Sequence, residues 1–298
     1  MMRFPRRLSG KILAATSLSI ASFFSIQSVQ AASLAKSSGE FAFSRFSSTP
    51  LFTDADSQTL TLTTGDDSEA EANADALFEV FPTINAANVI SNFAFSSEVA
   101  SSASSQSTAT VIGSFFVEDD ETFSFDFTGL IHLATAVDSL RDTAEAALAT
   151  QYSLFGQSDA AATPVEIDFF AMFGQLSTPS DMDSFGLDNS DAVMFESLEV
   201  TDMFGPVATK ENLSIEVSGR YERLFKAATT LTLIETKQGR AFAQSKSATD
   251  IPEHSSPWVW LLGTAGVLAL SRQQKIRALR MLEEQPADTK QTGTRYIA

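Results

Sequence analysis

Apolar and polar residues alternate along most of the chain between residues 40 and 235. The alternation is clearest over residues 40–46, 59–63, 122–127, 165–169, 213–218 and 230–235. A period of two is typical of β-strands with one buried face, so each stretch predicts a strand whose Phe, Leu, Ile or Val side chains point inward. Clusters of Gly, Pro, Asp and Ser separate the stretches. Roughly ten such strands predict a mainly β body, an antiparallel β-sandwich of jelly-roll-like type.

Three segments of the body are predicted differently. Residues 138–150 are rich in Ala, Glu and Leu, a composition that favours a helix, with an extended strand as the alternative. Residues 65–75 and 101–108 consist mainly of small and polar side chains. We expect both of these segments to form loops.

The first 31 residues have the three parts of a secretory signal peptide. Basic residues come first, at Arg3, Arg6, Arg7 and Lys11. An apolar stretch follows over residues 12–26, and the small residues after it predict cleavage between Ala31 and Ala32. The paired arginines leave the twin-arginine route open beside the general secretory route. We therefore expect the body to be exported.

A second apolar run lies near the C-terminus, from Trp258 to Leu270. Its length is close to the minimum for a helix that crosses a bilayer. Trp258 and Trp260 stand at its beginning, where interfacial aromatic residues belong. Basic residues follow it at Arg272, Lys275, Arg277 and Arg280. This order predicts a transmembrane helix with the body outside and a polar tail, residues 281–298, in the cytoplasm.

Charge and cysteine content narrow the classes of partner. Residues 32–250 contain 10 basic and 33 acidic residues. Because binding to a phosphate backbone requires Lys and Arg, this balance argues against nucleic acid as a partner. The chain contains no cysteine, which excludes disulfides, thiolate metal sites and cysteine nucleophiles.

The C-terminal segment, residues 250–280, resembles a PEP-CTERM sorting signal. Pro252, Glu253 and His254 occupy the place of that family's Pro-Glu-Pro tripeptide, ahead of the apolar run and the basic cluster. The body, residues 32–249, looks like those of cyanobacterial PEP-CTERM proteins, through its segments 109–127, 219–223 and 230–233. The resemblance implies processing by an exosortase-like membrane protease and delivery to the cell surface or extracellular matrix. Since histidine replaces the second proline, permanent anchoring in the membrane is the alternative.

Candidates for chemistry are few. His132 alternates with Ile131 and Leu133, so we expect it on the opposite strand face rather than in a catalytic triad or a zinc site. Loop carboxylates suit Ca²⁺. The candidates for that ion are Asp181, Asp183, Asp188 and Asp191. The stretch from Asp181 approximates an EF-hand loop with Gly186 at its sixth position, and solvated loop acids without a bound metal or cofactor are the favoured alternative.

The least acidic part of the body is residues 210–246, with seven basic and four acidic residues. Arg220 and Arg223 either project toward an anionic polymer or pair with acids on a strand face. We expect a non-enzymatic exported protein of the cell surface or extracellular matrix. Its expected partners are the exosortase-like protease, the membrane and extracellular polysaccharide. The alternatives are a carbohydrate-binding module, with or without Ca²⁺, and a secreted hydrolase that would use converging carboxylates or His132.

Overall fold

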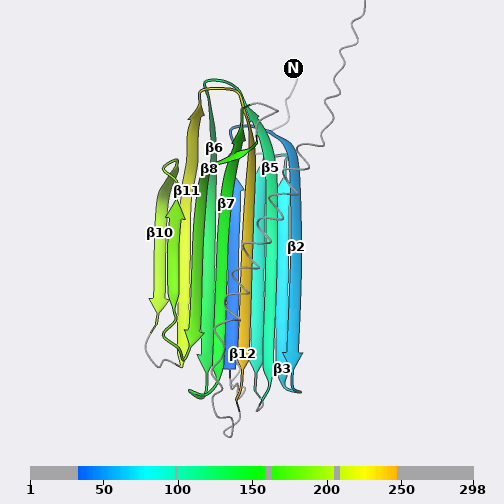
Figure 1. The fold of residues 1–298 in the computed structure, drawn as a ribbon, viewed down its shortest axis with the longest axis vertical. Coiled ribbons are helices and arrows are strands. Elements are labelled where there is room, and N and C mark those ends of the chain that lie inside the picture. Colours follow the sequence, from blue (N-terminus) through cyan, green and yellow to red (C-terminus); the bar gives the residue numbers. More distant parts are fainter. Residues whose placement is uncertain (1–32, 98–99, 159–162, 205–208, 247–298) are drawn as a thin grey trace, which may run out of the picture.

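The computed structural model describes residues 33–97, 100–158, 163–204 and 209–246. The predicted cleavage site, the sorting signal and the transmembrane helix lie outside these described residues. No helix in the described part of the chain has the length and hydropathy needed to cross a membrane. Its regular structure consists of twelve β-strands in two antiparallel sheets, which confirms the predicted mainly β body and is consistent with a β-sandwich (Figure 1).

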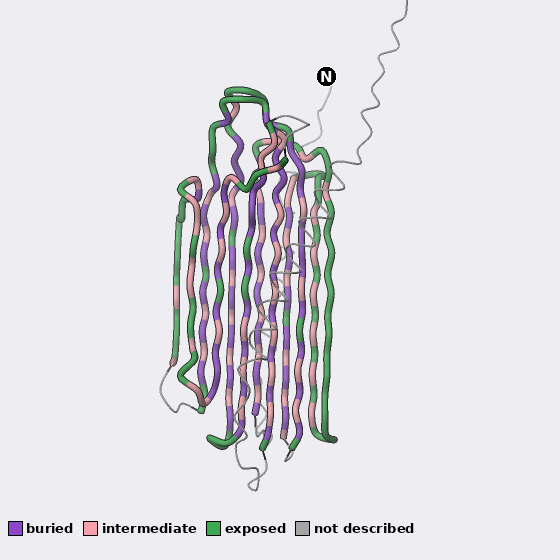
Figure 2. The backbone as a smooth tube through the Cα atoms, in the orientation of Figure 1, coloured by how far each residue is buried: buried purple, intermediate pink, exposed green. Residues whose placement is uncertain are grey.

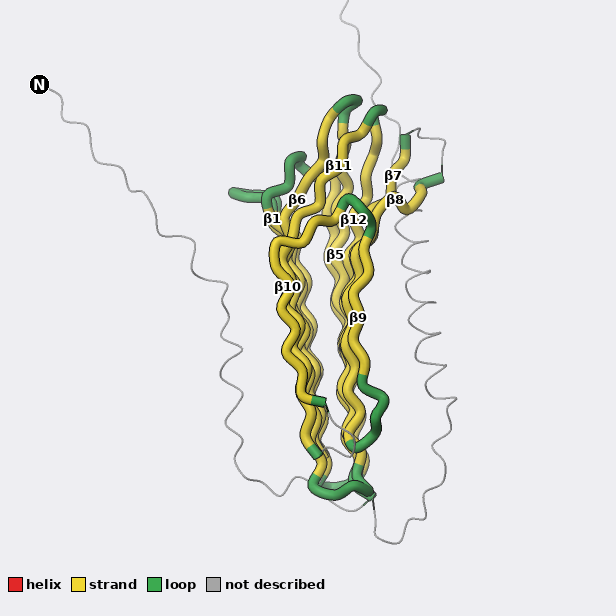
Figure 3. The backbone as a smooth tube through the Cα atoms, turned by 90° about the vertical axis from the view of Figure 1, so that its left-hand side faces the viewer, coloured by secondary structure: helices red, strands yellow, loops and turns green. Residues whose placement is uncertain are grey.

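The two sheets lie face to face as two layers (Figure 3). The first sheet has the order β10 (Val193–Met203), β11 (Lys210–Phe225), β6 (Glu121–Val137), β1 (Ser33–Ser44), β4 (Asn85–Ser96) and β3 (Ser68–Glu79). The second sheet has the order β2 (Pro50–Thr64), β5 (Ser102–Val117), β12 (Thr229–Gln244), β7 (Thr143–Gln157), β8 (Val165–Thr178) and β9 (Ser184–Asn189). Twelve strands exceed the eight of a jelly roll, and the jelly-roll-like topology stays a prediction.

Both ends of the described body leave from the same end of the sandwich. Ser33 pairs with Ser96 at the beginning of β1, and Ser245, directly after β12, donates its backbone N–H to the carbonyl of Ser101 at 3.1 Å. Ser96 Oγ donates to that same carbonyl at 3.0 Å. We call this the basal end, and the opposite end, with the turn between β11 and β12, the distal end. The 16 residues of β12 set the two ends about 50 Å apart.

Phenylalanine fills the distal part of the core. Phe41 and Phe43 on β1 and Phe123, Phe125 and Phe127 on β6 are buried at 2% exposure or less. The alternation over residues 40–46 and 122–127 predicted these inward faces, and that prediction is confirmed. Phe41 stacks on Phe127, and Phe43 meets Phe125 edge to face. Such aromatic pairs stabilise the fold beyond their buried area.

Alanine fills the basal part of the core. A second buried cluster consists of Ala35, Ala94, Ala103, Val137, Ala144, Ala241 and Ala243. Because small side chains suffice there, segments without large apolar residues still form strands. The predicted loops at residues 65–75 and 101–108 are therefore wrong over most of their length, since they belong largely to β3 and β5.

The helix favoured over residues 138–150 is also wrong. A turn over residues 138–142 leads into β7, which is the alternative that the composition left open. Ala144, Ala146 and Leu148 all point into the core, and β7 pairs with β12 on one side and β8 on the other. Pairing on both sides provides hydrogen-bond partners for the backbone N–H and C=O groups of β7. This pairing overrides the helix propensity of its residues.

Strand β2 departs from the expected burial. The alternation over residues 59–63 predicted an inward-facing Leu60 and Leu62, but these side chains are 64% and 65% exposed. Their register with β5 places both side chains on the outer face of the second sheet. The first sheet packs on the inner face and does not cover them. In Figure 2 the strand is coloured as exposed along nearly all of its length.

Candidate functional site

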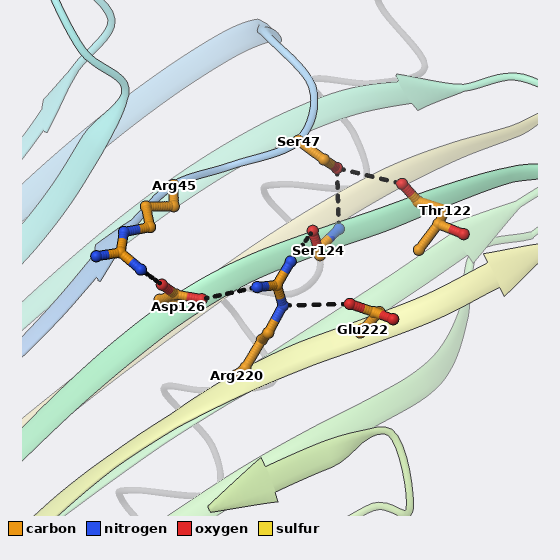
Figure 4. A network of polar contacts seen from close by, with 7 residues as sticks. All are labelled: Arg45, Ser47, Thr122, Ser124, Asp126, Arg220 and Glu222. Atoms are coloured by element: carbon orange, nitrogen blue, oxygen red, sulfur yellow. Dashed lines mark hydrogen bonds and ion pairs between the residues drawn. The ribbon is translucent and has the colours of Figure 1, made fainter. Parts of the chain in front are cut away.

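An ion-paired network lies on the outer face of the first sheet, near the distal end (Figure 4). Arg45 Nη1 donates to Asp126 Oδ2 at 2.9 Å. Arg220 lies between two carboxylates, 3.9 Å from Asp126 and 3.2 Å from Glu222. Arg45 directly follows β1, while register places Arg220 of β11 directly opposite Asp126 of β6. Arg220 therefore pairs with acids of its own strand face, which is one of the two arrangements expected for it.

A second ion pair lies beside a buried tyrosine. Arg223 Nη1 donates to Asp168 Oδ2 at 2.8 Å and to the carbonyl of Ile167 at 3.2 Å. Tyr221 Oη donates to the same Asp168 oxygen at 2.8 Å. Burial, followed by the hydrogen bond with Asp168, raises the pKa of Tyr221 above its usual range. The hydrogen bond with Asp168 also raises the pKa of Arg223, so this guanidinium stays charged.

The position of Asp168 corrects the expected strand face. The alternation over residues 165–169 predicted that Val165, Ile167 and Phe169 point inward, but Val165 is 62% exposed and Asp168 is buried. The inward face instead continues from Asp168 through Phe170 and Met172. A β-bulge between β7 and β8 shifts the register at this point, and a shift of one residue moves every side chain to the other face.

A surface depression of about 550 Å³ lies beside this cluster. Its lining consists of Ile167, Asp168, Ser190, Asp191, Ala192 and Arg223. The side chain of Arg223 is 42% exposed and that of Asp168 only 5%, so the cation, rather than its partner, faces solvent. Ser190 supports the wall, because its Oγ donates to the carbonyl of Phe169 at 3.3 Å. Charged and hydroxyl groups beside the apolar Ile167 and Ala192 suit a small polar ligand.

A buried polar cluster between the sheets has a different character. Glu235 and Lys237 of β12 are fully buried, and both contact Asn88 of β4. Lys237 Nζ donates to the carbonyl of Asn88 at 3.0 Å, and the Asn88 side-chain amide donates to Glu235. Thr150 Oγ1 donates to the other Glu235 oxygen at 2.7 Å. Since both ionisable groups are sealed from solvent, this cluster acts on the stability of the fold.

The Ca²⁺ candidates are not brought together. Asp181 and Asp183 lie in the turn before β9, whereas Asp188 is near the end of β9 and Asp191 follows it. A strand of six residues separates the two pairs by roughly 15–20 Å. The EF-hand-like stretch from Asp181 has this strand in its middle. Among the described residues, no group of three or more His, Asp or Glu side chains is placed to hold a metal ion.

One other expected position, that of His132, is confirmed. His132 lies half-buried on the outer face of β6, opposite the inward Ile131 and Leu133. Burial and the charge of Lys36 lower its pKa, so the imidazole is mainly neutral at neutral pH. In the distal turn after β11, Lys226 pairs with Asp120 at 3.0 Å.

The comparisons with known proteins add no relative. No protein-family model, no curated protein and no solved structure matches the chain. The site described above therefore depends on its own geometry.

Proposed function

We propose that the chain is a non-enzymatic exported protein of the cell surface or extracellular matrix, attached at its basal end by the C-terminal sorting signal. The observation that carries this proposal is the common exit of both ends of the body. Ser33 follows the signal peptide, and Lys246 precedes the sorting signal, at the same end of the sandwich. Asp168 lies level with Leu233 of β12, 11 residues before Gln244, so a membrane attachment beyond Lys246 places the Asp168 cluster roughly 35 Å from the basal end, where it faces the surroundings.

The first prediction concerns export. Because the chain has no cysteine, an introduced thiol is a unique reporter, and Asp119 lies exposed in the distal turn. We expect an Asp119→Cys variant to react with a membrane-impermeant maleimide on intact cells of the native host. As a control, Ala35→Cys, at a buried position of β1, is expected to react only after denaturation. Labelling of Asp119→Cys that requires cell lysis would contradict export.

The mature termini report on processing in the same cells. We expect mass spectrometry to place the N-terminus at Ala32. A C-terminus near residues 252–254 indicates cleavage by the exosortase-like protease, whereas a C-terminus at Ala298 indicates permanent anchoring. An intact chain of 298 residues in the cytosol would contradict both alternatives.

The depression beside Asp168 favours a second candidate function, carbohydrate binding. The exposed carboxylate of Asp191 can accept from sugar hydroxyls and the guanidinium of Arg223 can donate to them. Ile167 and Ala192 offer the apolar surface that the C–H face of a sugar ring contacts. Pairing with the buried Asp168 holds the guanidinium of Arg223 in place for such a ligand.

The second prediction tests this candidate on a glycan array, with and without Ca²⁺. For any glycan that the chain binds, we expect Arg223→Ala to weaken the affinity about tenfold. The matched control is Arg220→Ala, three residues earlier on β11 but outside the depression, and it is expected to leave the affinity nearly unchanged. No binding under either condition, or equal losses in the two variants, would remove the carbohydrate-binding reading.

A further inference from the structure

Strand β2 (Pro50–Thr64) is an unpaired edge of the second sheet. It hydrogen-bonds to β5 on one side, and it ends the strand order on the other. Its 15 residues exceed the 12 of β3, the 11 of β10 and the 6 of β9, the other edge strands. An edge strand presents a row of free backbone N–H and C=O groups to an incoming strand.

Both faces of β2 are open to solvent. All of its residues except Pro50 and Thr53 are exposed. Apolar side chains stand among them, with Leu51 at 67%, Leu60 at 64% and Leu62 at 65% exposure. Figure 2 shows the strand at the outer margin of the molecule, beyond the buried strands. The edge therefore combines free backbone groups with apolar side chains that a partner strand would cover.

The surroundings of this edge are uniformly acidic. Asp54 and Asp56 of β2 and Asp66 and Asp67 in the turn after it are exposed. Nearby, β3 exposes Glu69, Glu71, Asp75 and Glu79 on the outer face of the first sheet. The sequence has no Lys or Arg between Arg45 and Arg141, so no cation on these strands neutralises them. A second copy of the chain would bring the same carboxylates against this surface, which is electrostatically unfavourable.

We propose that β2 is a docking edge for an extended, cationic segment of another protein. The segment adds to the second sheet as a further strand, through backbone hydrogen bonds to β2. Its Lys or Arg side chains lie on the outer face of the second sheet, beside Asp54 and Asp56, and their aliphatic stems cover Leu60 and Leu62, which share that face. Charge complementarity selects the partner, while the unpaired backbone sets its extended conformation.

The test uses the full-length chain and two labelled peptides of about ten residues. One alternates Lys with Val, and the other alternates Lys with Pro, so their charges are equal but the second lacks half of the N–H donors. We expect the Lys-Val peptide to bind about tenfold more tightly or better, because several backbone hydrogen bonds are lost with proline. We also expect it to slow amide hydrogen exchange within residues 50–64.

A matched pair of variants locates the site. Leu60→Lys with Leu62→Lys places two cations on β2, and Leu198→Lys with Met203→Lys places two cations on β10. All four side chains are at least 50% exposed, so folding is expected to tolerate each change. The β2 variant is expected to bind the Lys-Val peptide about tenfold more weakly, and the β10 variant to bind it almost as the unmodified chain does.

Three outcomes would overturn the proposal. Equal affinity for the two peptides would mean that charge alone attracts them. Protection from hydrogen exchange outside residues 50–64 would place the docking edge elsewhere. A dimer in light scattering that is lost in the β2 variant would show that the edge pairs with a second copy instead.

Discussion

Replacement of Lys237 by methionine is expected to lower the free energy of unfolding by about 3–5 kcal/mol, the usual cost of leaving a buried charge without the opposite charge that compensates it. Lys237 and Glu235 are both fully buried on the inner face of β12, where Asn88 contacts each of them. Removal of the ammonium group leaves the Asn88 carbonyl without this donor and Glu235 without its opposite charge. Urea unfolding of the full-length chain measures the loss.

The double variant Glu235→Gln with Lys237→Met is the control for this prediction. It removes both charges at once, and we expect it to be more stable than the single variant, since apolar or neutral replacements of buried pairs are often tolerated. A single variant within about 1 kcal/mol of the unmodified chain would show that the pair contributes little to stability.

The same pair predicts an unusual dependence of stability on pH. Burial raises the pKa of Glu235 from 4.5 to about 7. The contribution of Glu235 to the free energy of unfolding is therefore fully present below pH 4.5 and is lost as the pH rises through 7. Burial lowers the pKa of Lys237 from 10.5 to about 7. The contribution of Lys237 to the free energy of unfolding is therefore fully present above pH 10.5 and is lost as the pH falls through 7. The combined contribution is therefore smallest near pH 7. The difference in unfolding free energy between the unmodified chain and the double variant, measured at pH 5, 7 and 9, should show this minimum.

Phe125→Ala is expected to destabilise the sandwich by about 3–5 kcal/mol, because it leaves a cavity in a close-packed core. The Phe125 ring is fully buried and lies 5.0 Å from that of Tyr221 and 5.4 Å from that of Phe43, measured between centroids. Tyr152 contacts it at 5.6 Å from the opposite sheet. The substitution therefore removes contacts within the first sheet and between the two sheets.

The matched control is Phe116→Ala on β5, whose side chain is 47% exposed. We expect it to change the unfolding free energy by about 0.5 kcal/mol or less. Urea unfolding of both variants gives the comparison, and a similar slope with denaturant shows that both unfold from the same compact state. Equal losses at the two positions would contradict the assignment of Phe125 to the centre of the core.

Local alternation predicted the strands that bury large side chains. Residues 122–127 and 213–218 were assigned with their inward faces correct, because Phe, Leu, Ile or Val recurs there at every second position. Residues 65–75 and 101–108 were missed because alanine and serine carry almost no signal of burial. Their strands exist because the basal core is narrow enough for alanine to fill.

The candidate site was visible in the sequence only in part. Arg220 and Arg223 were recognised as candidates, but their partners come from distant strands. Asp168 is 55 residues from Arg223 along the chain, and the bulge that turns Asp168 inward depends on pairing between β7 and β8. Glu235 and Lys237 continue the inward period of Leu231 and Leu233, so a strict period of two could have identified them as buried.

The sequence by itself determined the mainly β body and most of its inward-facing phenylalanines, since the period of a strand is a local property of the chain. The export and sorting signals that it predicts lie outside the described residues. The tertiary structure alone decided which strands are neighbours, which edge remains open at β2 and which charges meet at Asp168 and Asp126. These features depend on contacts between residues far apart in the chain, and a local pattern carries no information about such contacts.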